Sequence, residues 1–190
     1  MHPAGFSTRW GPTGSGVNAN FRLTWDIAWP KGVRNPMRPR AFSYRQGQLL
    51  AKALNEAGAD YLFIGKSGAI ILGYPDTTQD VDIYPKKDPE NGKRIVQALL
   101  KLGFRLDKKT KQAVIQGKDF VQIKSGPFDI DLVFAPDGLE DYEAVKKRSV
   151  RVREFPVARM EDIIKSKEAA KRARDLRDLP FLREFAKTLK

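Results

Sequence analysis

The pattern of apolar and polar positions changes near residue 43. Residues 1–42 hold glycine, proline, serine, asparagine and scattered tryptophan, and no period of 2 or 3.6 persists there. Such composition is typical of a flexible extension. Its basic residues are opposed by Asp26 alone and would suit a polyanion. The alternative is a start codon assigned too early, close to Met37. We expect residues 43–190 to form one folded domain.

From residue 43 onward, helical and extended patterns alternate. Apolar residues three and four positions apart predict helices, and short runs of β-branched and aromatic residues predict strands. The predicted helices cover residues 44–57, 66–72, 89–102, 159–170 and 175–187. The predicted strands cover residues 61–64, 80–83, 113–115, 120–123 and 128–134. This order predicts an α/β (α+β) fold, in which a small mixed β-sheet has helices packed on one side and a C-terminal helical tail follows.

The first candidate site is the turn between the strand at 61–64 and the next helix. It contains Gly65, Lys66, Ser67 and Gly68. Free backbone N–H groups at a helix N-terminus, small side chains and an ammonium group together suit a phosphate. The alternative is an ordinary turn that uses glycine for its backbone angles. The spacing of a P-loop is absent, so this turn does not belong to that class.

Two predicted strands present carboxylates at alternate positions. Asp80 and Asp82 are two residues apart, as are Asp129 and Asp131, so each pair lies on one face of its strand. Carboxylates this close repel one another unless a cation lies between them, and such oxygen ligands suit Mg²⁺ or Mn²⁺ bound together with substrate phosphates. The alternative is a solvated strand face with ordinary surface aspartates. Beside the candidate phosphate turn, these acids predict metal-assisted chemistry on a nucleotide.

Seven residues match, at unbroken spacing, the signature of a known superfamily: Gly65, Gly73, Pro75, Thr77, Thr78, Asp80 and Asp82. Through them the chain resembles the nucleotidyltransferases that share the DNA polymerase β palm. The resemblance is to the minimal prokaryotic members, including those of toxin-antitoxin and abortive-infection systems, and it extends over residues 45–185. Two positions depart from the pattern, because many relatives have a glycine at Lys66 and an arginine at Asp76.

The resemblance implies a nucleotidyltransferase fold and an enzyme that transfers a nucleoside monophosphate from a nucleoside triphosphate, ATP among them, to a hydroxyl group. Two-metal catalysis with Mg²⁺ or Mn²⁺ is implied as well. The implied catalytic and metal-binding residues are Asp80, Asp82 and Asp131, of which Asp131 mainly activates the acceptor. The implied nucleotide-binding residues are Gly65, Lys66, Ser67, Thr78 and Lys167. The resemblance also draws attention to Asp175 and Asp178.

The net charge of +12 bears on the acceptor. Basic residues cluster in two segments, 146–153 and 165–177, which is the electrostatic footprint of a polyanion partner. This favours RNA, tRNA in particular, as the acceptor, and a small protein partner would fit a toxin-antitoxin pair. One alternative is transfer to a small molecule such as an aminoglycoside. Another is a nucleic-acid-binding relative without turnover.

Composition excludes several other chemistries. With no cysteine and one histidine, the chain has no Cys/His zinc site, no thiol nucleophile and no Ser-His-Asp triad. No apolar run approaches the roughly 20 residues that a membrane-spanning helix needs. We therefore expect a cytoplasmic protein.

Overall fold

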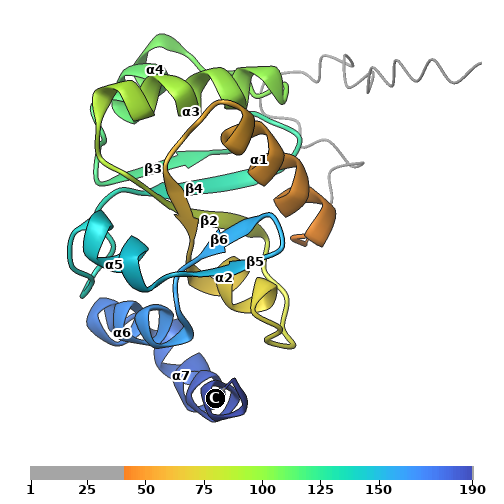
Figure 1. The fold of residues 1–190 in the computed structure, drawn as a ribbon, viewed down its shortest axis with the longest axis vertical. Coiled ribbons are helices and arrows are strands. Elements are labelled where there is room, and N and C mark those ends of the chain that lie inside the picture. Colours follow the sequence, from red (N-terminus) through yellow and green to blue (C-terminus); the bar gives the residue numbers. More distant parts are fainter. Residues whose placement is uncertain (1–40, 190) are drawn as a thin grey trace, which may run out of the picture.

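A computed structural model describes residues 41–189, so the predicted extension over residues 1–42 and the alternative start at Met37 lie almost entirely outside it. The described residues form one mixed sheet with the strand order β3-β4-β2-β1-β6-β5 (Figure 1). Its strands are β1 Tyr61–Phe63, β2 Asp80–Pro85, β3 Phe120–Ile123, β4 Asp129–Val133, β5 Val150–Val152 and β6 Phe155–Val157. The helices are α1 Tyr44–Glu56, α2 Gly65–Ile71, α3 Pro89–Lys101, α4 Lys108–Ile115, α5 Tyr142–Arg148, α6 Met160–Ala170 and α7 Ala173–Thr188.

The predicted α+β class with a mixed sheet is confirmed, but helices cover both faces of the sheet instead of one. Phe63 and Ile83 contribute to a large core that includes residues of α1, α3 and α4. Their neighbours Leu62 and Tyr84 contribute to a second core with residues of α2, α5, α6 and α7. Because successive side chains of a strand point to opposite faces, strands with apolar side chains on both faces require a cover on each side.

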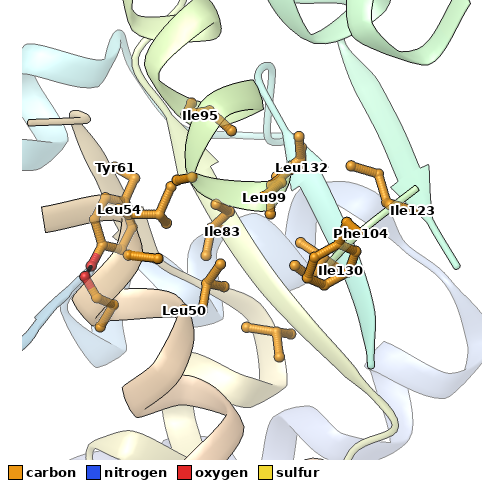
Figure 2. Close-up of a cluster of buried hydrophobic side chains, with 14 of the residues drawn as sticks. Leu50, Leu54, Tyr61, Ile83, Ile95, Leu99, Phe104, Ile123, Ile130 and Leu132 are labelled. Carbon is orange, nitrogen blue, oxygen red and sulfur yellow. Dashed lines mark hydrogen bonds between the residues drawn. The ribbon is translucent and has the colours of Figure 1, made fainter. Parts of the chain in front are cut away.

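The larger core lies between the sheet and the helices α1 and α3. Figure 2 shows Leu50 and Leu54 of α1 and Leu99 of α3 gathered around Ile83, with the β4 residue Ile130 beside them. All five side chains are fully buried. The core therefore holds β2 and β4 rigidly, and these are the strands that carry the candidate carboxylates.

One predicted strand is wrong. Residues 113–115 form the last turn of α4, although three consecutive apolar residues fit a short strand. The helix begins at an N-cap, Asp107, whose carboxylate accepts a hydrogen bond from the backbone N–H of Thr110 at 2.7 Å. Val114 is fully buried in the larger core. Only Val114 of α4 is fully buried, and Ala113 and Ile115 beside it are partly buried, so the helical period gives a weak signal in the sequence.

An ion-pair cluster joins α5 to α6. Arg148 donates from Nε to both oxygens of Asp162 at 3.0 Å and from Nη2 to Oδ1 at 2.6 Å, and it also reaches Glu140. The Asp162 side chain is 6% exposed, whereas that of Glu140 is 47% exposed. The buried carboxylate therefore depends on Arg148 for its compensation.

We expect Arg148→Ala to lower the free energy of unfolding by roughly 3 kcal/mol, because it leaves the buried Asp162 carboxylate without its cation. Glu140→Ala should have a much smaller effect, since exposed ion pairs contribute little. Urea denaturation of both variants measures the difference. Equal losses would contradict the assignment of Asp162 as the buried anchor.

None of the helices within residues 41–189 is both long enough and apolar enough to cross a membrane.

Candidate active site

The parallel pairing of β2 and β4 brings the aspartates of both strands together. Asp80 lies opposite Asp129, and Asp82 lies opposite Asp131. Because all four occupy alternate positions in register, they share one face of the sheet, which we call the carboxylate face. Val81, between Asp80 and Asp82, is 1% exposed and belongs to the core on the other side. The predicted alternation of acids and core residues in these strands is confirmed.

The carboxylate face disfavours its own negative charge. Burial, followed by the neighbouring Asp131 and Asp80, raises the pKa of Asp82 to about 7, although a hydrogen bond that the Ser67 backbone donates to its carboxylate and the charge of Lys167 act in the opposite direction. The pKa of Asp131 is also raised, chiefly by burial and by Asp80, against a lowering hydrogen bond from Gln122. A proton or a cation would relieve this repulsion.

The metal predicted from the sequence fits the donor chemistry of this face, but the side chains do not form a ready-made cage. In residues 41–189, no three His, Cys, Asp or Glu side chains are gathered so as to hold a metal ion as they stand. Asp82 lies against Gly65, and Asp131 accepts a hydrogen bond from Gln122. Adjacent carboxylates with raised pKa values are nevertheless the oxygen ligands that Mg²⁺ prefers. Binding would therefore involve a change of rotamer at these aspartates.

Gly65 lies directly beneath the Asp82 carboxylate. Its φ of +59° falls in the left-handed region, and a Cβ at this position would lie 2.6 Å from Oδ2 of Asp82. Both facts require glycine here. The predicted turn thus begins α2 immediately beside the carboxylate face, which is the juxtaposition that the sequence predicted.

The Ser67 hydroxyl is engaged within the fold. Its side chain is fully buried, and its hydroxyl accepts a hydrogen bond from the backbone N–H of Asp82 at 2.9 Å. The same hydroxyl lies 3.3 Å from the carbonyl oxygens of Ile64 and Asp82, to either of which it can donate. The hydroxyl is therefore occupied in fastening α2 to β2, and any contact of this residue with a phosphate would come from its backbone N–H.

Lys66 connects the two positions at which the chain departs from the superfamily signature. Its ammonium lies 2.8 Å from Oδ2 of Asp76 and 2.8 Å from Oδ2 of Asp178 in α7. Burial lowers the pKa of Lys66, but the hydrogen bonds to both acids raise it overall. The two residues that differ from the pattern the chain resembles, Lys66 and Asp76, thus form an ion pair with each other.

Lys167 lies near the carboxylate face, and Thr78 does not contact it. Lys167 donates to Oδ1 of Asp175 at 2.5 Å in a largely buried pair between α6 and α7, and its charge lowers the pKa of Asp82. Thr78 is half-buried in the loop before β2, where its carbonyl accepts a hydrogen bond from the N–H of Phe42 at 2.5 Å. No hydrogen bond joins Thr78 to Asp80, Asp82 or Asp131 within residues 41–189.

Sequence reasoning missed Gln122. Its Nε2 donates to Oδ1 of Asp131 at 3.0 Å, and the two residues are direct partners in the antiparallel pairing of β3 with β4. The register of this hairpin is the signal that could have identified it, because Gln122 alternates with two buried β3 residues and must share a face with Asp131.

If the carboxylate face performs the nucleotidyl transfer that the sequence predicts, Gly65→Ala should reduce it at least tenfold, because the new methyl group displaces the Asp82 carboxylate. Left-handed strain should also lower the free energy of unfolding by about 1–2 kcal/mol. Gly58→Ala is the matched control, since Gly58 has a φ of +65° and nothing within 4 Å of an added Cβ. It should show the stability loss alone, and equal activity in the two variants would contradict the role of Gly65.

Comparison with known protein sequences identifies no family for this chain. No protein-family model matches the chain, and no curated protein sequence matches it. Among solved structures, the fold is similar to that of a Thermotoga maritima protein that bears the provisional name nucleotidyltransferase. The two chains are 16% identical with a TM-score of 0.46, over 76% of this chain and 92% of the other. A likeness of this strength supports no conclusion about family or activity.

Proposed function

We propose that the protein is a metal-dependent nucleotidyltransferase. The observation that carries the proposal is the in-register pairing of Asp82 with Asp131, next to a glycine turn that abuts the Asp82 carboxylate. Clustered carboxylates with raised pKa values are typical of a functional site, because a structural role would not favour their mutual repulsion. The match of Gly65, Asp80 and Asp82 to the superfamily signature supports the same conclusion.

In this proposal Asp80, Asp82 and Asp131 hold Mg²⁺ or Mn²⁺, which would supply positive charge to the phosphate oxygens when bound. The acceptor hydroxyl oxygen gives its proton to the Asp131 carboxylate and forms a bond to the α-phosphorus, while the bond to the departing pyrophosphate breaks. Asp131 serves the acceptor side, and Gln122 keeps its carboxylate oriented. Positioning and electrostatics would supply most of the rate.

The triphosphate would lie at the start of α2. Gly65 admits a phosphate there because it has no side chain, and Lys66 offers a cation that Asp76 and Asp178 hold in place. Lys167 adds a second cation beside Asp82. Each lysine already pairs with acids of the fold, Lys66 with Asp76 and Asp178 and Lys167 with Asp175, so the metal would supply the net positive charge that a triphosphate needs at this face.

RNA is the acceptor that we favour, with tRNA as the first candidate, because the chain carries a net charge of +12. Transfer to a small hydroxyl compound is the second candidate, since the carboxylate face alone does not select an acceptor. A toxin-antitoxin role would require a small protein partner that binds this chain and changes its transfer rate.

Binding of Mn²⁺ tests the site, and it is measured as the loss of the electron paramagnetic resonance signal of the free ion. We expect the native chain to take up Mn²⁺ more tightly when a nucleoside triphosphate is present, and Asp80→Asn/Asp82→Asn to lose most of this uptake. Asp137→Asn is the control, because Asp137 is an exposed acid outside the sheet. Equal uptake by all three proteins would contradict the proposal.

A further inference from the structure

A second region of positive charge lies away from the carboxylate face, between α4 and the start of β3. An open depression of about 850 Å³ there is lined by Lys87, Lys108, Lys109 and Lys118. Only Lys87 has an acidic partner among the described residues, Asp119 at 3.1 Å. The other three ammonium groups are exposed and form no ion pair within residues 41–189. A concave surface with several uncompensated cations suits a partner that carries repeated negative charges.

The placement of two of these lysines is unfavourable for the helix that carries them. Lys108 and Lys109 occupy the first turn of α4, directly after the N-cap Asp107. A cation at a helix N-terminus opposes the helix dipole and lowers helix stability. Folding therefore gives no reason for this pair, whereas binding of an anionic partner would.

The tail segments that the sequence singled out are less available. Among the basic residues of 146–153 and 165–177, five form ion pairs with acidic residues: Lys146, Arg148, Lys165, Lys167 and Arg172. Five of the eleven basic residues in these segments are thus balanced within the fold. The lysines around α4 are the ones that gather about a depression.

The edge strand β3 connects this depression to the carboxylate face. Lys118, Phe120, Gln122 and Lys124 are exposed, and within β3 they alternate with the buried Val121 and Ile123. Phe120 is 49% exposed, which is high for a large aromatic side chain. Gln122, next to Phe120 on this face of β3, donates a hydrogen bond to Asp131 of the carboxylate face. An exposed aromatic ring between cations is the arrangement on which single-stranded nucleic acids stack their bases.

We propose that the depression at α4 and the exposed face of β3 bind a single-stranded nucleic acid whose end reaches the carboxylate face. Lysines 108, 109 and 118 contact phosphates, and Phe120 stacks on a base. From Asp80 to Lys87 the extended chain covers roughly 20 Å at about 3.3 Å per residue. A strand of several nucleotides spans this distance, whereas a single small acceptor does not. The link to the acceptor rests on the proposed function, but the affinity itself does not.

Fluorescence anisotropy with labelled single-stranded RNA, single-stranded DNA and duplex RNA of the same length tests the surface. We expect the native chain to prefer the single strands. Lys108→Ala/Lys109→Ala should weaken binding at least fivefold. The slope of log binding constant against log salt concentration should become shallower by one to two. Phe120→Ala should weaken binding by about 5- to 100-fold. Circular dichroism should show unchanged folding, because neither change removes a stabilising contact of the core.

The matched control is Lys171→Ala/Arg174→Ala, which removes two exposed tail cations that have no ion-pair partner among residues 41–189. It should bind nearly as tightly as the native chain. Loss of binding in this control with retention in the α4 and β3 variants would overturn the proposal, as would a native chain that binds no single strand. Binding at the α4 surface without nucleotidyl transfer would uphold this inference and contradict the proposed function. If the native chain transfers a nucleotide to RNA and the α4 and β3 variants do so equally well, the proposed function would stand and this inference would be contradicted.

Discussion

Asp131→Asn should lower the rate of nucleotidyl transfer at saturating nucleotide by roughly 10³-fold or more, as expected when one charged group that acts on the transition state is removed. Triphosphate binding should change little, because Asp131 serves the acceptor side in the proposed arrangement. Asp82→Asn should lose both transfer and tight nucleotide binding, since Asp82 lies beside the turn that would hold the triphosphate.

Initial rates across nucleotide concentrations, together with direct binding of Mn²⁺-nucleotide, separate the two variants. Asp137→Asn, at an exposed acid, should retain the native values. The assignment of roles would be wrong if Asp131→Asn weakened nucleotide binding as much as Asp82→Asn does. It would also be wrong if either variant kept more than a tenth of the native rate.

The second large effect concerns stability and pH in the absence of divalent metal. Burial, with Asp131 next, raises the pKa of Asp82 from 3.8 to about 7. Between these values the unfolded chain loses the proton of this group while the folded chain keeps it, so the free energy of unfolding falls as pH rises from about 4 to about 7. At pH 8, Asp82→Asn should therefore be more stable than the native chain by about 4 kcal/mol, since each pKa unit corresponds to about 1.4 kcal/mol.

Urea denaturation at pH 4, 6 and 8, with a chelator present, measures this effect. The two proteins should have similar stabilities at pH 4 and diverge above it. Adding Mg²⁺ and a nucleoside triphosphate at pH 8 should stabilise the native chain and narrow the gap. If the difference in stability between the native chain and Asp82→Asn is the same at all three pH values, folding does not raise the pKa of Asp82.

Local sequence patterns account for much of the fold. The strands β1, β2 and β4 are short apolar or alternating runs bounded by glycine or proline, and such runs have few other interpretations. Residues 113–115 misled the analysis because α4 is short and buries one side chain deeply, Val114. The second helical layer was missed because α6 and α7 were taken as a tail, whereas Leu182 and Ile163 pack beneath the sheet.

Part of the candidate site could likewise be predicted from the sequence, and part could not. The pairs of acids were visible because their spacing matches the period of a strand. The partners of Lys66 and Asp131 were not visible, since they depend on distant contacts. Asp178 reaches Lys66 from a helix more than a hundred positions later, and Gln122 meets Asp131 only through the β3–β4 register. The occupied hydroxyl of Ser67 likewise follows from packing of α2 on β2.

The most direct test of nucleotidyl transfer at the carboxylate face is label transfer from α-³²P nucleoside triphosphates, each supplied in turn with Mg²⁺ or Mn²⁺ and total RNA. We expect label on RNA with the native chain and none with Asp80→Asn/Asp82→Asn. Label on a protein or a small compound instead would keep the reaction and change the acceptor. No transfer of any of the four nucleotides to RNA, protein or small hydroxyl compounds, by a chain shown to be folded, would contradict the account.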